Sequence, residues 1–586
     1  MKKFRLLVFA TLVAGSAGAQ YFQHTYGSQR KEVLESGVNT NVISPQGHLM
    51  TGYTDLLGPN ALVITRTNLN GRMGVPLPTF NNRYQIFENA VLVDAKGRSI
   101  VHSTALGGRI SVWGDHVSGA AGGPVSTKFF YALVAPNGGP AGIWSYALPF
   151  PIAEAEATGM CNSITNPVNM FVCGFVRLVA GGQRYPVVMC INGANGAIVW
   201  SNVYQCGNID WIATDVIESP FAPEVALSGH FIRPGAPSSG CFFRVANATG
   251  AFIPSIIEYG TPFTPNGGGL NAIDIANNPG PGFVLGGFYR NPANGTDDSW
   301  AINVNATGFV VNFSTLVDYT MPGNNDYGND VIERLNTTGV YEYYLGGYVA
   351  NGVFGGEDDV VYKLDFNGIP ANPGAQFTYG GPGNERAIQL AQYNGFGVNN
   401  NGLSVYGNTV NSWAAPGASD FYFVKSYFNG VTRCNYDLRD VPSMAGPGII
   451  EWWNATMPYS LMQSPLTMNV GSMQDFEICW APAMSPPGDN TRLAASTEIS
   501  QPGYFPNPVS RENGIVTVTF GRETVAGVAQ VELWNSLGQI CWTKQISVAD
   551  GQSGMQVELG NELQGGMYHL IVRQNGTLNN YRILVQ

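Results

Sequence analysis

A short motif built on one glycine recurs along most of the chain and constrains its fold more than any other feature. Gly287, Gly347 and Gly407 lie 60 residues apart, and each precedes an acidic residue, an apolar run and a glycine-containing turn. Weaker copies complete the series, and they centre on Gly52, Gly174, Gly229 and a degenerate stretch over 91–104. Repetition of this kind indicates seven similar units packed side by side between about residue 20 and residue 440.

Each unit is expected to fold as three or four short antiparallel strands. Its apolar runs are separated by turns of the Asn-Gly type, which favour tight hairpins. With 74 Gly, 36 Pro and 12% aromatic residues but only 12% charged residues, the composition suits short strands and many turns. Such sheets bury both faces when they pack radially around an axis. We therefore predict an all-β fold with a seven-bladed β-propeller over 20–440, and a pair of β-sandwiches is the less favoured alternative.

A tyrosine–glycine pair marks the joints between units, at Tyr26-Gly27, Tyr259-Gly260 and Tyr379-Gly380. Because the first pair precedes the first complete unit, the segment around Tyr26 could help to close the ring. The order Gly-Tyr followed by Asp-x-x-x-x-Lys-x-Asp-x-x-Gly resembles the SBBP-type propeller repeats of exported bacterial proteins, and units six and seven match best. This resemblance implies a fold and names no substrate.

The segment 1–19 has the three parts of a secretory signal peptide. Lys2-Lys3-Phe4-Arg5 is followed by a short apolar run and by Ala17-Gly18-Ala19, so we expect cleavage before Gln20. No other apolar stretch reaches the length of a membrane span, and an integral membrane protein is not expected.

The eight cysteines form no Cys-x-x-Cys pair of a zinc or redox site. Export permits disulfides, although sequence alone does not fix their pairing. Local disulfides are expected within one stretch that holds Cys161, Cys173, Cys190 and Cys206, and Cys434–Cys479 is a further pairing to consider. Cys541 stands alone and is expected to be a buried thiol.

The repeat stops at residue 440, and two further regions follow. Residues 441–500 are expected to form a β-rich extension, a small capping or linking module, that ends in a polar linker. Residues 501–586 contain six strand-like runs, which predict a compact Ig-like β-sandwich over 515–520, 528–534, 540–546, 555–559, 567–573 and 581–585.

The last region resembles the type A sorting domain of type IX secretion cargo. The motifs that carry the resemblance follow the family's order and contain Pro506, Asn507, Pro508, Gly538, Gly566 and Tyr568. The resemblance implies Sec export, passage through the type IX translocon and removal of 501–586 by a surface sortase. It also implies a Gram-negative host of the Bacteroidetes group and a cargo that is released or attached to lipopolysaccharide at the cell surface.

The sequence contains no recognisable catalytic motif. Its six histidines form no His-Glu-x-x-His pair, and neither a Gly-x-Ser-x-Gly elbow nor a phosphate-binding loop is present. We therefore expect no catalytic or cofactor-binding residues, and an enzyme is less favoured than a binding protein. A formal net charge of −11 makes nucleic acid an unfavourable partner.

Aspartates recur at equivalent points of three successive units and are the weak candidates for metal ligands. They are Asp297, Asp298, Asp358, Asp359 and Asp420. Carboxylate oxygens on one surface of a propeller could hold Ca²⁺. The favoured alternative is that these carboxylates accept local hydrogen bonds, because no Asp-x-Asp-x-Asp-Gly loop occurs.

Three functions fit these observations. The favoured one is a surface-displayed binding or adhesion module whose propeller takes a glycan or protein ligand. The second is a glycan- or peptide-degrading enzyme, which should gather His, Arg or carboxylate side chains around the axis. The third is a structural component of an extracellular layer or gliding apparatus, which should self-associate. Trp413, Trp452 and Trp453 would support the first function if they are exposed, because aromatic faces can stack on sugar rings. A position in the core is favoured for all three.

Overall fold

The computed structural model describes a large part of the 586-residue chain, namely residues 22–26, 31–40, 47–55, 59–68, 79–88, 91–118, 126–147, 152–206, 209–260, 267–291, 294–318, 324–353, 356–380, 383–394, 401–410, 419–430, 432, 436–439, 443–445, 449–454, 467–470, 472–477, 503–505, 515–519, 527–535, 540–548, 554–558, 566–574 and 577–585. The predicted signal peptide over 1–19 and the Cys434–Cys479 pairing lie outside these residues. The chain divides into two compact units, Met1–Ala483 and Met484–Gln586, each described by itself.

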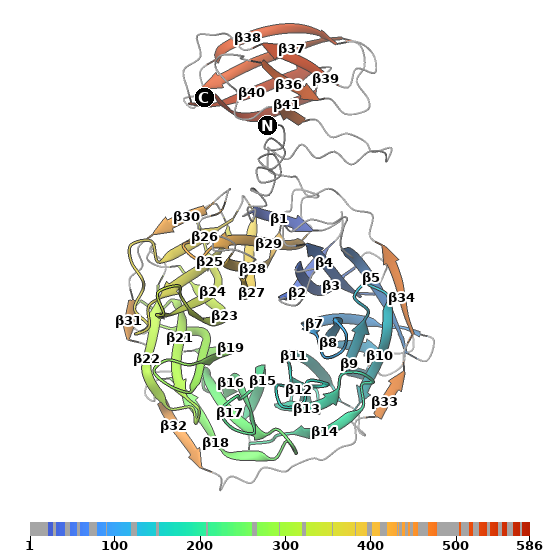
Figure 1. The fold of residues 1–586 in the computed structure, drawn as a ribbon, viewed down its shortest axis with the longest axis vertical. Coiled ribbons are helices and arrows are strands. Elements are labelled where there is room, and N and C mark those ends of the chain that lie inside the picture. The colour runs from blue at the N-terminus through green and yellow to red at the C-terminus, as the bar shows by residue number, and fades with distance from the viewer. Residues whose placement is uncertain are drawn as a thin grey trace, which may run out of the picture. The chain divides into compact units, whose positions relative to one another are not determined.

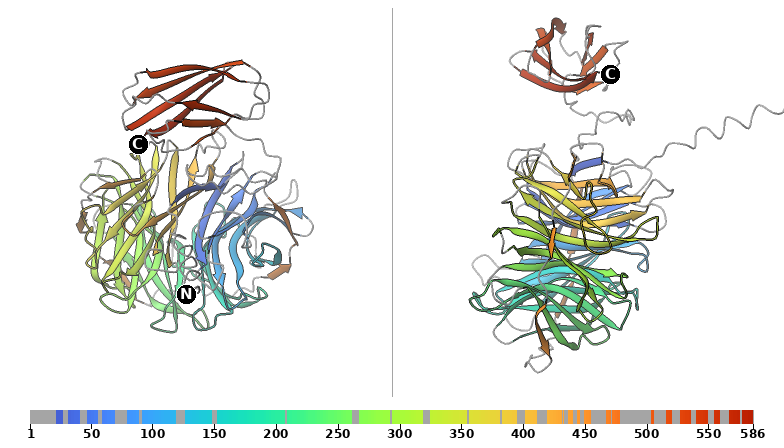
Figure 2. Two further views of the ribbon diagram at one scale, coloured as in Figure 1. Left: turned by 45° about the horizontal axis from the view of Figure 1, so that its top comes forward. Right: turned by 90° about the vertical axis from the view of Figure 1, so that its left-hand side faces the viewer.

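Seven antiparallel sheets follow one another around an axis in the first unit, which confirms the predicted seven-bladed propeller (Figure 1, and from the side in Figure 2). Blade 1 contains β2 (Glu32–Thr40), β3 (Gly47–Thr54), β4 (Ala61–Asn68) and β5 (Phe80–Glu88), to which the short β6 (Val91–Leu92) pairs. Blade 2 contains β7 (Asp94–Ser103), β8 (Arg109–Ser118), β9 (Ser126–Val134) and β10 (Pro140–Ala147). Blade 3 contains β11 (Glu154–Asn162), β12 (Asn169–Arg177), β13 (Arg184–Asn192) and β14 (Ile198–Val203).

The remaining blades repeat the same order of strands. Blade 4 contains β15 (Asp210–Glu218), β16 (Glu224–Ile232), β17 (Ser238–Ala246) and β18 (Phe252–Tyr259). Blade 5 contains β19 (Gly268–Ala276), β20 (Gly282–Arg290), β21 (Asp297–Asn305) and β22 (Val310–Val317). Blade 6 contains β23 (Asp326–Leu335), β24 (Tyr341–Ala350), β25 (Glu357–Leu364) and β26 (Gln376–Tyr379). Blade 7 contains β27 (Asn384–Asn394), β28 (Asn401–Val410), β29 (Ser419–Tyr427) and β1 (Phe22–Tyr26).

The ring closes at a seam between blades 7 and 1. The N-terminal strand β1 pairs with β29 as the outer strand of blade 7, as expected from the position of Tyr26. At the inner side of the seam, the Asn408 side chain accepts a hydrogen bond from the Leu34 N–H and donates one to the Leu34 carbonyl. The N-terminal segment thus completes blade 7 by backbone pairing at its outer edge, and side-chain hydrogen bonds join blade 7 to blade 1 near the axis.

The repeated glycine of each blade lies in its second strand, opposite a β-bulge of the first strand. Gly347, for example, pairs with Gly328, directly before the bulge that Asn329 forms. A Cβ atom added to Gly347 would overlap the carbonyl oxygen of Tyr327, and the same collision with the preceding carbonyl occurs at all seven positions. Because the bulge moves a first-strand carbonyl into the space of a side chain, only glycine fits there. The seven glycines are Gly52, Gly114, Gly174, Gly229, Gly287, Gly347 and Gly407.

Blade 2 corrects the sequence assignment of its repeat. The stretch 91–104, taken as a degenerate copy of the motif, is mainly the first strand β7, and the equivalent glycine is Gly114 in β8. Gly114 lies 60 residues before Gly174, so the spacing was present in the sequence. It was obscured because Asp115 replaces the aromatic residue that follows the glycine in most other blades.

A tyrosine near the end of the outer strand joins most blades to the next one. The Tyr259 hydroxyl donates a hydrogen bond of 2.5 Å to the Gly308 carbonyl, in a turn of the following blade where φ is 93°. The same bond runs from Tyr84 to Gly138, from Tyr146 to Gly196, from Tyr204 to Gly250 and from Tyr379 to Gly430. The Tyr-Gly pairs at Tyr259 and Tyr379 are thus two members of a larger set of contacts between blades.

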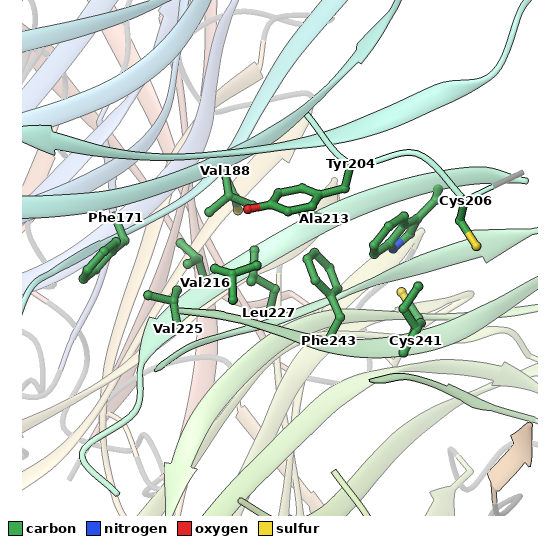
Figure 3. Packing of buried hydrophobic residues seen from close by; sticks show 14 of the residues in the cluster. Phe171, Val188, Tyr204, Cys206, Ala213, Val216, Val225, Leu227, Cys241 and Phe243 are labelled. Carbon is green, nitrogen blue, oxygen red and sulfur yellow. The ribbon is translucent and has the colours of Figure 1, made fainter. Parts of the chain in front are cut away.

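Each hydrophobic core lies between two neighbouring blades. The core between blades 3 and 4 includes Phe171, Val188 and Phe243 (Figure 3), and Trp211 belongs to the same cluster. It also contains Cys173, Cys190, Cys206 and Cys241. Burial of apolar area against both neighbours, rather than within one sheet, therefore stabilises the ring.

The cysteines of this region are thiols, which corrects the expectation of local disulfides. Cys161, Cys173 and Cys190 carry reduced thiols, and burial raises the pKa of Cys173 and of Cys190 to about 12. Cys173 pairs with Val188, so it is out of register with Cys190 on the neighbouring strand. In the second unit, the side chain of Cys541 is exposed rather than buried as expected.

The strands that follow blade 7 return around the outside of the propeller as a belt. They are β30 (Tyr436–Arg439), β31 (Ser443–Ala445), β32 (Ile449–Asn454), β33 (Thr467–Val470) and β34 (Ser472–Glu477). In this order they pair antiparallel with the outer strands of blades 6, 5, 4, 2 and 1 (Figure 1). The belt covers sheet edges that would otherwise expose backbone N–H and C=O groups. The described part of 441–500 thus extends the blades and forms no module of its own.

The second unit is also all-β. One sheet contains β35 (Gly503–Phe505), β36 (Ile515–Thr519) and β39 (Gly554–Glu558), and the other contains β38 (Ile540–Val548), β37 (Gly527–Asn535), β40 (Gly566–Gln574) and β41 (Thr577–Val585). Ala529, Val531 and Leu533 alternate along β37 and are buried, so this sheet has one apolar face. Six of the seven strands overlap the six runs expected from the sequence.

Candidate binding site on the axial rim

The residues that form the bulges of the first strands couple neighbouring blades around the axis. In blades 3 to 6 these residues carry neutral donors, and each donates a hydrogen bond to a first-strand carbonyl of the next blade. The bonds join Thr158 to Ala213, Thr214 to Leu270, Asn271 to Gly328 and Asn329 to Ala387, over 2.9, 2.7, 2.7 and 2.6 Å. The bulges therefore position the first strands relative to one another as well as creating the glycine sites.

Three aspartates of the first strands add a second set of contacts between blades. Asp215, Asp274 and Asp330 accept hydrogen bonds from backbone N–H groups of the following blade, those of Ile273, Glu333 and Leu390. Burial raises the pKa of Asp215 to about 7 and that of Asp274 to about 6. Burial and the neighbouring aspartates also raise the pKa of Asp330 well above its usual range. These carboxyls already bond to the backbone, which indicates a structural role.

A ring of residues at one end of the axis, which we call the axial rim, carries the candidate site. Two positions make up the rim. One is the residue that follows the repeated glycine in the second strand of a blade. The other is the residue two positions before the bulge residue in the first strand of the next blade. Phe288 of blade 5 meets Tyr327 of blade 6, Tyr348 of blade 6 meets Arg386 of blade 7, and Tyr53 of blade 1 meets Lys96 of blade 2. The same two backbone positions therefore carry a different pair of side chains at each of these three joints.

Blades 4 to 7 form the aromatic half of the axial rim. Ring centroids lie 6.0 Å apart for His230 and Phe288, 5.4 Å for Phe288 and Tyr327, and 5.0 Å for Tyr327 and Tyr348, and the last pair is stacked. The Arg386 guanidinium lies 4.9 Å from the Tyr348 centroid. All four rings are partly exposed, so each keeps apolar surface in contact with water.

Charged groups beside the aromatic half are balanced. The Tyr327 hydroxyl donates a 2.9 Å hydrogen bond to Asp297, which lies opposite Arg290 in the register of blade 5. Arg386 pairs with Glu357, with Nη2 at 2.7 Å from Oε1. The two arginines and two carboxylates at these exposed or partly exposed positions therefore balance in formal charge, and the neighbouring Asp359 and Glu385 are buried.

Blades 1 to 3 form the ionic half of the axial rim, and its centre is Arg98. This arginine is the bulge residue of blade 2, and its guanidinium contacts three carboxylates, one on each of these blades. It lies 3.0 Å from Glu35, 2.8 Å from Asp115 and 3.7 Å from Glu156. The Arg98 side chain is 16% exposed, so this cluster is much drier than the Arg386–Glu357 pair, in which Arg386 is 49% exposed.

The carboxylates of the ionic half are imperfectly compensated. Burial raises the pKa of Glu35, Asp115 and Glu156, although Arg98 opposes each shift. Burial and the charge of Glu35 also raise the pKa of Tyr53. One guanidinium thus holds together three acids whose charged forms are disfavoured by their surroundings.

The five candidate metal ligands do not converge on one site. Asp297 bonds to Tyr327 at the rim, whereas Asp298 is buried and accepts hydrogen bonds from Asn291 and Thr296 of the preceding loop. Asp358 and Asp420 occupy the register position equivalent to Asp298 in blades 6 and 7, and both are buried. Asp359 is also buried, and burial together with Glu385 and Asp358 raises its pKa well above the usual range.

Within the described ranges, no group of three or more His, Cys, Asp or Glu side chains is arranged to hold a metal ion. Trp413 lies outside those ranges, and Trp452 and Trp453 are placed on β32 of the belt. His116 hydrogen-bonds to Ser145 over 3.0 Å, but both side chains are buried, and burial lowers the pKa of His116 to about 4. This pair is inaccessible to a substrate.

The residues of the sorting motif are only partly described. Gly566 begins β40, and the buried side chain of Tyr568 lies on the same strand, opposite Ile583. Pro506, Asn507, Pro508 and Gly538 lie outside the described residues.

The rim was missed from the sequence, although part of its signal was there. The signal is the aromatic residue that follows the repeated glycine in several blades, such as Phe288 and Tyr348. Tyr327 and Arg386, by contrast, have no motif of their own, because the bulge that places them is set by pairing with the second strand.

No family model matches the sequence, and no curated protein matches it. Among solved structures the chain is similar to Sqt1 from Chaetomium thermophilum, at 10% identity and a TM-score of 0.32, over 70% of this chain and 98% of that one. It is also similar to PorZ of Porphyromonas gingivalis, a bacterial surface component of the type IX secretion system, at 9% identity and a TM-score of 0.14, over 96% and 100%. PorU of the same organism matches at 11% identity and a TM-score of 0.13, over 62% and 31%. These similarities are distant, and the fold described above rests on the strand order.

In the described part of the chain, no helix combines the length and apolar character that crossing a membrane requires.

Proposed function

We propose that this chain is an exported binding protein that the type IX secretion system delivers to the cell surface, with its ligand on the aromatic half of the axial rim. The observation that carries the binding role is the continuous series of four partly exposed rings across blades 4, 5 and 6, His230, Phe288, Tyr327 and Tyr348. Partly exposed tyrosines and arginines dominate binding energies at protein interfaces, because they bring large contact areas at low entropic cost.

The binding role is tested with the exported chain and a double variant, Tyr327→Ala with Tyr348→Ala. Fluorescently labelled protein is added to intact bacterial cells, to immobilised extracellular-matrix proteins and to insoluble polysaccharide particles. Phe366→Ala is the matched control, because Phe366 is an exposed aromatic (44%) in the turn between β25 and β26 of blade 6. Loss of binding in the double variant alone supports the proposal, and equal binding by all three proteins would overturn it.

Delivery through the type IX system is supported by the order of motifs in 501–586. Deletion of Gln501–Gln586 should retain the protein in the periplasm, whereas the full chain reaches the surface. A protease-accessibility assay on intact cells distinguishes the two locations. Surface exposure of the truncated chain would refute this part of the proposal.

A glycan- or peptide-degrading enzyme is the second candidate function, and the ionic half of the rim favours it. Glu35 and Glu156 flank the Arg98 guanidinium and have raised pKa values, as general acids near neutral pH require. Release of reducing ends or of new amino groups from polymeric substrates is the test. Turnover that Glu156→Gln abolishes and Glu342→Gln, at a structural ion pair, leaves intact would replace the binding-only proposal.

A further inference from the structure

We propose that the aromatic half of the axial rim binds an uncharged carbohydrate chain. This inference rests on the proposed binding function and specifies its ligand class. It is carried by the combination of a series of aromatic rings with a locally balanced set of charged groups.

The aromatic series matches a ligand that extends over several similar units. The rings follow one another over blades 5 and 6 in the order Phe288, Tyr327 and Tyr348, with His230 of blade 4 at one end and Arg386 of blade 7 at the other. Each ring is partly exposed, and aromatic surface of this kind packs against the apolar C–H faces of sugar rings. A repeated ligand can use several such contacts at once.

The charges beside the rings exclude a polyelectrolyte as the preferred ligand. Arg386 is paired with Glu357, and Arg290 lies opposite Asp297. A polyanion would gain from the two arginines but would be repelled by the two carboxylates, and a basic peptide would meet the reverse. The net formal charge of −11 for the whole chain further disfavours polyanions.

The polar groups that remain suit hydroxyl groups. A carboxylate accepts several hydrogen bonds, and a guanidinium donates up to five, so Asp297, Glu357 and Arg386 can each bond to a ligand in addition to their protein partners. Sugar hydroxyls both donate and accept, and they can therefore bond to both kinds of group. The Tyr327 hydroxyl is already oriented by its bond to Asp297, which fixes the ring before a ligand arrives.

The test uses the full exported chain and measures affinity by calorimetry for soluble dextran, laminarin and mannan, with heparin and alginate as charged polymers. We expect binding to at least one neutral polymer, a loss of roughly tenfold for Tyr327→Ala and for Tyr348→Ala, and no change for Phe366→Ala. Affinity should change little between low and high salt, because no charge is neutralised on binding. Near-native circular dichroism and unfolding midpoints establish that each variant is folded.

Two results would overturn the inference. The first is binding that is confined to heparin or alginate and weakens steeply with salt, which would assign a polyanion site. The second is no binding to any neutral polymer while the tyrosine variants still lose adhesion to cells or matrix proteins. In that second case the rim remains the binding site and only the ligand class is wrong, whereas unaltered adhesion in those variants removes the site itself.

Discussion

The two halves of the axial rim share one backbone design and differ in chemistry. Both place a side chain after a repeated glycine against a side chain two residues before the next bulge. In blades 2 and 3 these positions include Asp115 and Glu156, which Arg98 contacts together with Glu35, whereas in blades 4 to 6 they include four neighbouring rings. The difference shows that the repeat determines the backbone position of a rim residue, and that the chemical type of its side chain varies independently of the repeat.

The halves also differ in whether their rim side chains stabilise the closed ring of blades. Arg98 bridges three blades and is largely buried, so its loss would remove the cation that contacts all three acids. In the aromatic half the blades are joined below the rim by neutral donors such as Asn271 and Asn329, so the rings above are not needed for closure. The aromatic half is therefore the part that can be altered without unfolding the propeller.

The largest effect is expected for Arg98→Met. It removes the cation that contacts Glu35, Asp115 and Glu156 directly, and we expect a loss of about 3 kcal/mol in the free energy of unfolding at pH 7. Urea denaturation followed by tryptophan fluorescence measures it. Because protonation relieves the repulsion, the loss should shrink at pH 4.5. A loss at pH 7 below that of the exposed Arg386→Met would contradict the assignment of Arg98 as the centre of the ionic half.

The second largest effect is on the pH dependence of the free energy of unfolding, and it concerns Asp215 of blade 4. Its folded pKa of about 7 exceeds its unfolded value, so its contribution to stability is full below about pH 4 and is lost as the pH rises to about 7. Relative to Asp215→Asn, the wild-type protein should therefore lose on the order of 2 kcal/mol between pH 5 and pH 8. Urea midpoints at four pH values give this difference, and parallel curves for the two proteins would show that Asp215 does not titrate in this window.

A smaller effect is expected for Asn329→Ala. It removes the donor to the Ala387 carbonyl and should cost about 1 kcal/mol at any pH between 5 and 8, since no charge is involved. Thr214→Val, which removes the equivalent donor with little change of shape, should have a similar cost. If the loss of stability in either variant depended strongly on pH, the joints between blades 4 to 7 would not be uncharged, in contradiction to the difference from Arg98.

The smallest effect is expected for Arg386→Met. Its ion pair with Glu357 is exposed, and such pairs contribute about 0.5 kcal/mol or less. The unfolding midpoint should thus move little, while high salt should remove even this difference. A loss comparable to that of Arg98→Met would mean that both halves support the ring equally.

The fold was predictable because its main determinant is local and repeated. A glycine that must lie against a bulged carbonyl recurs once in every blade, and turn chemistry supplies the strand breaks around it. The exception, blade 2, was misplaced because Gly114 lacks the usual aromatic neighbour. The strands of 501–586 were likewise visible as short apolar runs.

The site was less predictable because it depends on contacts between blades. Arg98 has no motif, yet it contacts Glu35 63 residues before it and Glu156 58 residues after it. The recurring aspartates did carry a pattern, but Asp298, Asp358 and Asp420 are buried, and Asp298 bonds to its own loop. The repeated sequence positions thus identified residues that pack inside the blades more readily than residues that form the exposed rim.

The belt changes how the ring can open. Blades that contact only their neighbours can separate one at a time, as in other repeat proteins. Here one continuous segment pairs with blades 6, 5, 4, 2 and 1 in turn, and it ends on blade 1, beside the seam that the N-terminal strand closes on blade 7. Opening any of these blades therefore also requires the release of a belt strand, so the five should exchange their amide hydrogens as one cooperative group. Blades 3 and 7 are the natural points of first opening, since their outer strands β14 and β1 have no belt partner among the described strands.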